Sequence, residues 1–383
     1  MNHSKTLSLF VLLAVSSTVA CAGSKADTAT PAPAPAPEPV AEVEEAKPPV
    51  APIPEGYHAL TPQLTVKGLD EAVDFYVKTL GAVQTAEMKG PDGKLMHAEV
   101  KIGDSNIMLD EENLENGMKS PTTLGGSSAG LLTYVDDVDV AYAALVDGGA
   151  TPAMPPEDMF WGDRYASVVD PFGHHWSVAT HLEELTDEQM MQRAEIAFAP
   201  PPALTKGKKG KKAKAPAEPA WKAIEAAAAI EKKPSKYHSV TVSLVVANAA
   251  EAIEFYKAAF GATELSRMPG PDGKLMHAEL KIGDSLLMLA DEWPDAGQKS
   301  ATTIGGSAVA LHYYNEDVDA AFAQATGAGA VSVFPVADVF WGDRYGAVID
   351  SSGYMWGLAT HIADLTSAEM TERMMAEEAK PQS

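Results

Sequence analysis

Two periodicities of apolar and polar side chains alternate from about residue 57 onward. From Leu69 to Leu80 the apolar side chains recur every three or four positions and Gly81 ends the run, which predicts an α-helix. Period-two alternation predicts strands around it, because successive side chains of a strand point to opposite faces. We expect these strands at His58–Val66, Val83–Met88, Leu95–Ile102 and Asn106–Asp110. This order is one βαβββ unit.

The same order then follows a second time. A strand is predicted at Gly130–Val135, a helix at Val138–Gly148, and further strands near Ala153 and over Tyr165–Val169 and Trp176–Thr180. The sequence Asp170-Pro171-Phe172-Gly173 is typical of a tight turn between the last two strands. If Val169 pairs with His174 across this turn, Arg164 lies on the polar face of the sheet. Two βαβββ units predict an α+β domain.

An internal repeat doubles the arrangement. Tyr57-His58 recurs as Tyr237-His238, and the run GPDGKLMHAE at 90–99 recurs unchanged at 270–279. KIGDS at 101–105 and FWGDRY at 160–165 recur at 281–285 and 340–345. One offset separates every pair, so the copies align without a gap. We predict two tandem domains of one fold, at 57–197 and 237–376, with a short tail at 377–383.

The N-terminus has the pattern of an export signal. Lys5 precedes the apolar run Leu7–Val15, and small residues lead to Cys21, the one cysteine of the chain. The pattern resembles a bacterial lipoprotein signal, so residues 1–21 are predicted to be a signal peptide and Cys21 to be lipidated. An ordinary secretory signal is the alternative. The Ala/Pro-rich stretch 22–56 is expected to be a disordered, extended tether.

The acidic charge of the chain and the composition of its linker indicate which partners it can bind. With 53 acidic against 29 basic side chains, the chain should repel phosphates, so no nucleic acid partner is expected. The linker 198–236 is rich in Pro and Lys; its lysines, Lys206 to Lys214, either contact anionic lipid or cell-wall polymer or are simply solvated. Trp221–Lys232 is Ala-rich and predicts a short helix. Ala22 and Gly23, after Cys21, lack the aspartate that retains lipoproteins at the inner membrane, which by resemblance predicts an outer-membrane lipid anchor on the periplasmic side.

The elements and motifs resemble the vicinal oxygen chelate (VOC) superfamily, the glyoxalase/bleomycin resistance/dioxygenase group, and within it the PhnB-like branch. The resemblance covers nearly all of both copies and rests on Ala72–Ala82, His97-Ala98-Glu99, Lys101–Asp104, Gly162-Asp163-Arg164 and Asp170–His174. It implies that each domain is a cupped mixed sheet with helices on its outer face and a cavity inside. The superfamily contains lyases, dioxygenases, isomerases and drug-sequestering proteins, so the activity stays open.

Metal-using members of the superfamily place His or Glu at four strand positions. The resemblance puts these positions at Thr61, Met108, Gly130 and Ser177 in the first copy and at Thr241, Met288, Ala310 and Gly357 in the second. None is a good ligand for a transition metal ion. We therefore expect no metal there and no cofactor. An unconventional site built from His97, Glu99 and His181 is the alternative.

Strand alternation predicts which side chains line the cavity. His97 and Glu99, two apart on one strand, are candidates for general acid/base chemistry, as are His277 and Glu279; a structural hydrogen-bonded pair is the alternative. Arg164 would either hold a carboxylate or phosphate or form a salt bridge within its domain. The predicted ligand-binding residues are Gln63, Met108, Tyr134, Arg164, Ser177, His181, Met288, Tyr314, Arg344 and His361.

Three functions remain open at this point. The missing metal ligands and the tether favour an envelope-anchored protein that binds a small molecule without metal. The candidate acid/base residues favour a lyase or isomerase acting on a small oxygenated substrate. A structural lipoprotein is the third. The linker is long enough for the two domains to pair within one chain, so we expect an intramolecular pseudo-dimer. The first copy's cavity should be the more polar, because its Asp110, His175 and Ser177 are Ala290, Met355 and Gly357 in the second.

Overall fold

A computed structural model describes residues 50–90, 92–199, 219–229 and 231–378. The first copy contains β1 (Leu60–Val66), α1 (Leu69–Leu80), β2 (Val83–Lys89), β3 (Leu95–Ile102), β4 (Ser105–Glu111), α2 (Pro121–Leu124), β5 (Ala129–Tyr134), α3 (Val138–Asp147), β6 (Thr151–Asp158), β7 (Asp163–Val169), β8 (His175–His181), β9 (Glu183–Glu184) and α4 (Asp187–Ala197). The predicted signal peptide with Cys21, most of the tether, the lysine cluster of the linker and the end of the tail lie outside the described residues.

The second copy repeats the first element by element. After η1 (Ala220–Ala223) and β10 (Ala227–Ala228) come β11 (Val240–Val246), α5 (Ala249–Phe260), β12 (Thr263–Pro269), η2 (Pro271–Gly273), β13 (Leu275–Ile282), β14 (Ser285–Asp291), η3 (Pro294–Ala296), α6 (Ala301–Ile304), β15 (Val309–Tyr314), α7 (Val318–Gly327), β16 (Val331–Asp338), β17 (Asp343–Ile349), β18 (Met355–His361) and α8 (Ser367–Glu378). The predicted α+β fold with two tandem copies is confirmed.

Local sequence signals explain the elements that were predicted well. The helix at Leu69–Leu80 has the predicted bounds; it ends at Gly81, which adopts a left-handed φ of 65°. The helix predicted over Trp221–Lys232 is wrong, because that segment forms the 3-10 turn η1 and the short strand β10. There, tertiary contacts override the helix propensity of alanine: Trp221 is buried beneath Arg193 of α4, and β10 pairs with β9.

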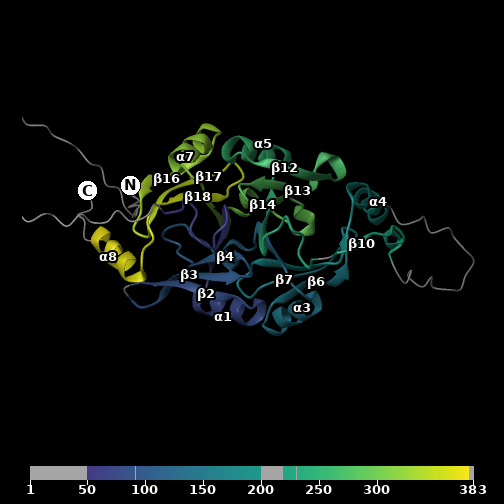
Figure 1. Cartoon of the computed structure of the whole chain (residues 1–383), viewed down its shortest axis with the longest axis horizontal. Helices are drawn as coiled ribbons and strands as arrows, with labels where there is room; N and C mark the ends of the chain where they lie inside the picture. The colour runs from purple at the N-terminus through teal and green to yellow at the C-terminus, as the bar shows by residue number, and fades with distance from the viewer. Residues whose placement is uncertain (1–49, 91, 200–218, 230, 379–383) are drawn as a thin grey trace, which may run out of the picture.

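Each eight-stranded sheet takes one βαβββ module from each copy. The strand order of the first sheet is β16-β17-β18-β15-β1-β4-β3-β2, and that of the second is β12-β13-β14-β11-β5-β8-β7-β6. Antiparallel pairs join the modules at the centre, β1 with β15 and β11 with β5. Figure 1 shows α1 and α3 along one side of the molecule and α5 and α7 along the other. The copies therefore pair within one chain, as predicted, by sharing both sheets.

The two modules of one copy meet through their helices instead. α1 packs against α3, and α5 packs against α7. Beneath α1, the buried Asp170 carboxylate accepts hydrogen bonds from the Tyr76 hydroxyl (2.6 Å) and the Trp176 indole N–H (3.0 Å). Tyr256, Asp350 and Trp356 repeat this network in the second copy. Each network ties a helix of one module to the last strand of the other.

The repeated KIGDS turns form the seam between the copies. A Cβ on Gly103, which has a φ of 58°, would lie 2.2 Å from the Ser239 hydroxyl, and a Cβ on Gly283 would lie 2.5 Å from the Ala59 side chain. Only glycine fits both the backbone conformation and the close approach. The next residue of each turn binds the other copy: the Asp104 carboxylate accepts the Ser239 N–H (2.5 Å), and the Asp284 carboxylate accepts the Ala59 N–H (2.8 Å).

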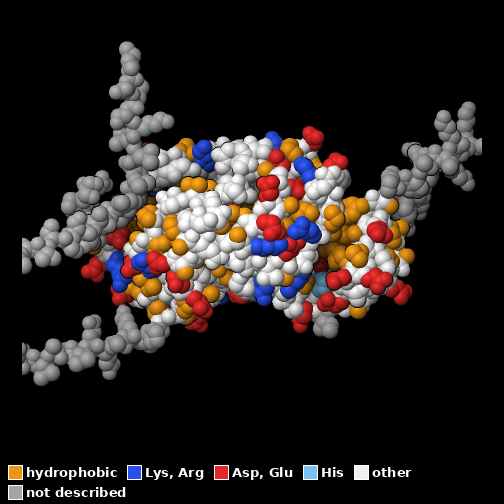
Figure 2. Space-filling model, turned by 90° about the horizontal axis from the view of Figure 1, so that it is seen from above, with side chains coloured by type: hydrophobic (Ala, Val, Ile, Leu, Met, Phe, Trp, Pro, Cys, Tyr) orange, Lys and Arg blue, Asp and Glu red, His pale blue; other side chains and the backbone are white. Residues whose placement is uncertain are grey.

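One end of the molecule carries α4, η1 and β10. Figure 2 shows hydrophobic side chains gathered near this end, and Met191, Ile196 and Phe198, in and just after α4, are exposed. Among the residues with described positions, no helix combines the length and the apolar character needed to cross a membrane.

Candidate functional site

The candidate site residues lie on the sheet faces turned away from the helices. We call the face of the sheet containing β1 and β15 face A, and that of the sheet containing β11 and β5 face B. Cross-strand partners such as Thr61 and His312 share face A, although they come from different copies. Both are enclosed, with exposed fractions of 1% and 4%. Sequence reasoning expected a cavity within each copy, whereas both copies build each face.

A chain of ionisable groups, joined by hydrogen bonds and one ion pair, crosses the first-copy half of face A. His97 Nδ1 lies 2.8 Å from an Asp110 carboxylate oxygen, and His97 Nε2 lies 3.7 Å from Glu99. The Tyr57 hydroxyl donates to the other Glu99 oxygen. Burial works to lower the pKa of His97, but its two carboxylate partners outweigh burial and raise the pKa to about 10. Burial likewise opposes ionisation of Glu99, yet His97 and Tyr57 lower its pKa. Both groups are therefore charged at neutral pH.

The second-copy half of face A is organised around a buried carboxylate. Asp343 accepts hydrogen bonds from the Tyr314 hydroxyl (3.0 Å) and the Trp341 indole (3.0 Å), and its other oxygen is 2.8 Å from His361 Nδ1. His312 lies near this group, with its ring centroid 4.5 Å from that of Tyr314. Its buried Nε2 has no hydrogen-bond partner among the described residues. Burial lowers the pKa of His312 to about 4, so its imidazole is neutral.

The charged state of His97 predicts a pH-dependent contribution to stability. Its folded-state pKa of about 10 lies above the ordinary value of 6.5, so the contribution is complete below about pH 6.5 and is lost as the pH rises through about 10. The melting temperature of wild type should exceed that of His97→Gln most at about pH 6 and least near pH 10. His277→Gln is the matched control, because Ala290 stands where Asp110 would be. A difference that grows with pH would contradict the assignment.

Face B has the same plan without counterparts of Asp110 and His312. Glu279 accepts from the Tyr237 hydroxyl and lies 2.7 Å from Lys236 Nζ. Burial opposes its ionisation, but the neighbouring His277 and the hydrogen bonds from Lys236 and Tyr237 lower its pKa to about 2. The counterparts of Asp110, Gln63 and His312 are Ala290, Ser243 and Leu132. The three residues expected to make the first copy's cavity the more polar do not share one face: Asp110 lies on face A, whereas His175 and Ser177 lie on face B.

A cavity opens at the end of face B, beside the linker segment. Its volume is ≈ 310 Å³, within the usual range for small-molecule sites. Asp163 forms part of its wall and is tied to face B by the Tyr134 hydroxyl (3.0 Å) and by His181 Nδ1 (2.7 Å). The remaining lining residues are Asp158, Met159, Gly162, Leu182, Glu183, Trp221, Lys222, Ala226 and Ala228.

The Glyoxalase/Bleomycin resistance protein/Dioxygenase superfamily matches this chain twice, over residues 57–178 and 238–358. The chain belongs to this superfamily. A stretch of 135 residues is 45% identical to the uncharacterized protein Mb0911c of Mycobacterium bovis and covers 34% of this chain and 89% of that protein. The uncharacterized protein Rv0887c of Mycobacterium tuberculosis is also 45% identical over 135 residues, which are 79% of its length.

Solved structures show the same fold across both copies of this VOC protein. Glyoxalase I from Zea mays is 15% identical, with a TM-score of 0.50 over 84% of this chain and 96% of that one. A point mutant of the same maize enzyme is 16% identical, with a TM-score of 0.51 over 84% of this chain and 95% of that one. At these identities the likeness concerns the fold alone.

The positions at which the resemblance places metal ligands are divided between the two sheets, instead of meeting within one copy. Since β1 and β4 share a sheet with β15 and β18, face A brings Thr61 and Met108 together with Ala310 and Gly357. The Tyr345 ring covers the last of these positions, because a Cβ on Gly357 would lie 2.7 Å from it. The alternative site from His97, Glu99 and His181 is wrong, because His181 lies in the other sheet.

The predicted ligand-binding residues divide between the faces, with two exceptions. Face A holds Gln63, His97, Glu99, Met108, Tyr314 and His361; face B holds Tyr134, Ser177, His181, His277, Glu279 and Met288. Arg164 and Arg344 lie on the helix-packed side. Val169 pairs with His175 and not with His174, and this one-residue shift reverses the face of Arg164. Its guanidinium binds Asp139 (2.6 Å) and Asp158 (2.8 Å), the salt-bridge alternative.

Sequence reasoning missed three kinds of residue. Tyr57 and Tyr237 reach the faces from before the first strand of each copy, where no strand pattern includes them. Asp163 and Asp343 were not among the predicted site residues, although they are the buried hydrogen-bond acceptors at the end of each face. The linker residues around Trp221 form a cavity wall. The exact repetition of Tyr57 and of Asp163 in both copies was the available signal for the first two kinds.

Proposed function

We propose that this VOC protein binds a small amphipathic molecule in the cavity at the end of face B, without a metal ion. The observation that carries the proposal is a cavity of ≈ 310 Å³ that joins apolar linker and loop side chains to the buried carboxylate of Asp163. The described linker segment completes the wall, so the site needs this chain's own connection between its copies.

The wall chemistry selects a ligand that donates hydrogen bonds. Asp158, Asp163 and Glu183 supply carboxylate oxygens, which only accept; each already accepts from a protein group, namely Arg164, Tyr134 and Arg193, and a ligand donor would use the remaining lone pairs. Lys222 is the one cationic side chain among the lining residues, and it already lies 2.7 Å from Asp158. Met159, Leu182 and Trp221 supply apolar surface. An aromatic or alicyclic amine or alcohol therefore suits the cavity better than a carboxylic acid of the same size.

Filling the cavity should weaken this binding. Ala226 lines the cavity, whereas its neighbour Ala227 pairs with Glu184 in β10 and is exposed. We expect Ala226→Phe to weaken binding at least tenfold, about 1.4 kcal/mol, and Ala227→Phe to leave it unchanged. A panel of small aromatic amines and alcohols, with the matching carboxylic acids, is screened by thermal shift, and the amines or alcohols that bind are titrated calorimetrically into both variants.

Either of two outcomes would contradict the proposal. If no amine or alcohol stabilises the protein, or if Ala226→Phe and Ala227→Phe bind equally well, the cavity is not the site. Preference for the carboxylic acids would contradict the assigned ligand chemistry.

A second candidate, a lyase or isomerase, is favoured by one observation on face A. The chain Tyr57–Glu99–His97–Asp110 places an ionised carboxylate next to a hydroxyl donor and a charged imidazole. Such a group can remove a proton next to a carbonyl while a neighbour stabilises the oxyanion. Glu99→Gln should then abolish deuterium exchange at the α-carbon of small hydroxyketones, followed by NMR, and Glu279→Gln should not. Equal exchange in both variants would exclude this role.

We also propose that the protein is held at the cell envelope through Cys21. Support comes from the sequence pattern around this single cysteine and from the Ala/Pro-rich stretch after it. Cys21→Ser should move the protein from the detergent-soluble membrane fraction to a released or unprocessed form. Unaltered fractionation of that variant would rule out a lipid anchor.

A further inference from the structure

Hydrogen bonds from indole N–H groups to aspartate carboxylates recur in this fold. Among the described residues three occur, at similar distances: Trp176 to Asp170 (3.0 Å), Trp356 to Asp350 (2.9 Å) and Trp341 to Asp343 (3.0 Å). The first two are equivalent in the repeat, and the equivalent of the third is the pair Trp161 and Asp163. In the described part of the chain, no hydrogen bond joins that fourth indole to its carboxylate.

The equivalent carboxylates of Asp163 and Asp343 otherwise have the same kinds of partner. Each accepts a tyrosine hydroxyl on one oxygen (3.0 Å), and its other oxygen lies 2.7 Å (Asp163) or 2.8 Å (Asp343) from a histidine Nδ1. On Asp343, the oxygen that accepts the hydroxyl also accepts the Trp341 N–H. A carboxylate oxygen has two lone pairs. The corresponding Asp163 oxygen, which accepts from Tyr134, therefore keeps one acceptor position that has no donor among the described residues.

The acceptor position left free on Asp163 belongs to a residue in the wall of the cavity at the end of face B. The Asp163 side chain is 7% exposed, whereas the Asp343 side chain, with its indole bound, is 2% exposed. Trp221, also in the wall, is buried and supplies aromatic surface. The cavity therefore joins an unfilled carboxylate acceptor to an aromatic side chain.

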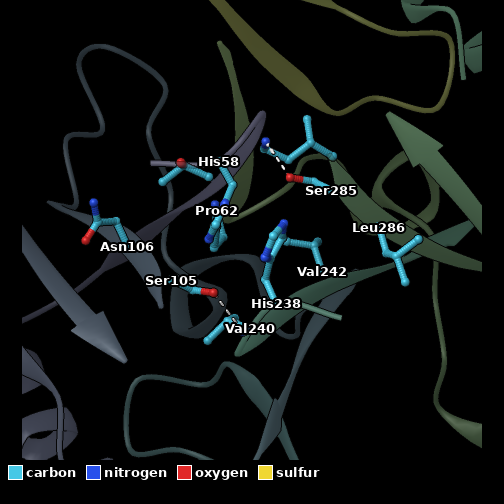
Figure 3. Close-up of a pocket in the computed structure, with 11 residues that line it drawn as sticks. His58, Pro62, Ser105, Asn106, His238, Val240, Val242, Ser285 and Leu286 are labelled. Atoms are coloured by element: carbon cyan, nitrogen blue, oxygen red, sulfur yellow. Dashed lines mark hydrogen bonds between the residues drawn. The ribbon is translucent and has the colours of Figure 1, made fainter. Parts of the chain in front are cut away.

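A much smaller cavity lies at the seam between the copies, beside the stacked rings of His58 and His238 (Figure 3). Its volume is ≈ 10 Å³, about enough for one water-sized sphere. Of these two cavities, the one at the end of face B has the room for an aromatic ring.

We propose that the cavity at the end of face B binds a planar aromatic molecule with a ring N–H, such as an indole, and that this N–H donates to Asp163 as the Trp341 indole donates to Asp343. The inference rests on the proposed function, because it names the ligand class for the same cavity. The N–H of an indole donates and does not accept, so it complements an oxygen that can only accept. The planar ring also matches the aromatic surface of Trp221.

Ligands of one shape, with and without the donor, test the proposal on the full-length chain. Indole and benzofuran are bicyclic rings of similar size, but benzofuran has an oxygen where indole has its N–H. Because a hydrogen bond to a charged group is stronger than one between neutral groups, indole should bind wild type at least about tenfold more tightly than benzofuran. 1-Methylindole, which also lacks the donor, should bind as weakly as benzofuran. Calorimetric titration measures all three affinities.

Replacing the carboxylate should remove the preference for the donor. In Asp163→Ala the ratio of the indole and benzofuran affinities should fall to about one, whereas in Asp343→Ala, the matched change in the second copy, it should stay as in wild type. Circular dichroism and melting establish that each variant is folded before titration. NMR of ¹⁵N-labelled indole gives a second measurement on the unaltered chain: the N–H proton of the bound ligand should shift downfield and exchange slowly with water.

Equal affinity of wild type for indole and benzofuran would overturn this inference, as would an unchanged preference for indole in folded Asp163→Ala. Either result leaves the proposed function standing if other aromatic amines or alcohols bind and Ala226→Phe weakens their binding. If no aromatic ligand binds wild type, the proposed function and this inference are both wrong.

Discussion

Replacing Asp170 by alanine should lower the free energy of unfolding by about 4 kcal/mol, since a buried donor left without its partner costs about 1–3 kcal/mol. Four donors lose their acceptor: the Tyr76 hydroxyl, the Trp176 indole, and the N–H groups of Phe172 and His174, the last two at 2.9 Å. All of them are buried or held in the turn between β7 and β8.

The repeat supplies the comparisons for this prediction. Asp350→Ala removes the same network from the second copy and should have a similar effect. Asp136→Ala, at an exposed position, should change stability by no more than about 0.5 kcal/mol. Urea unfolding followed by tryptophan fluorescence gives the three values. A loss below about 1 kcal/mol for Asp170→Ala would show that the network does not hold the two modules together.

The first copy expressed alone, as residues 50–199, should form a homodimer. In the whole chain β1 pairs with β15 and β5 pairs with β11, so both central strands of an isolated copy lose their partners. A second molecule can supply them, because β5 and β15 are equivalent in the repeat and unpaired strand edges associate. Light scattering during gel filtration measures the mass.

Gly103, at the seam between the copies, provides a control for this prediction. A side chain at position 103 would collide with the other copy in the whole chain, at Ser239. Gly103→Val should therefore keep the isolated copy from pairing. A folded monomer of the unaltered copy would contradict the prediction. It would mean that β1 and β5 can pair within one copy, and that sheets shared between copies form only when both copies are in one chain.

The sequence was sufficient for local structure. The helix at Leu69–Leu80 and the strand at Leu95–Ile102 have the predicted bounds, because period and capping glycine act within a few residues. Face residues such as His97 and Glu99 followed from alternation. Pairing of the copies followed from the repeat and the linker length.

What the sequence could not determine was pairing between equivalent strands. The sequences of β5 and β15 alternate apolar and polar side chains in nearly the same way, so either strand could pair with β1. Only the packing of the whole chain determines that β1 pairs with β15. The predicted position of Arg164 was wrong for a local reason. Asp170 binds the N–H groups of Phe172 and His174 inside the turn, which lengthens it and moves the pairing of Val169 by one residue.

Cysteine cross-linking tests the shared faces most directly. Leu60 faces Tyr313 and Val240 faces Thr133 across the two central strand pairs. In chains carrying Cys21→Ser, oxidation should join Leu60→Cys to Tyr313→Cys, and Val240→Cys to Thr133→Cys, within one chain, as read by peptide mapping. Leu60→Cys with Thr133→Cys, and Val240→Cys with Tyr313→Cys, should stay reduced. The reverse pattern would show that each copy closes its own sheet and would contradict the account.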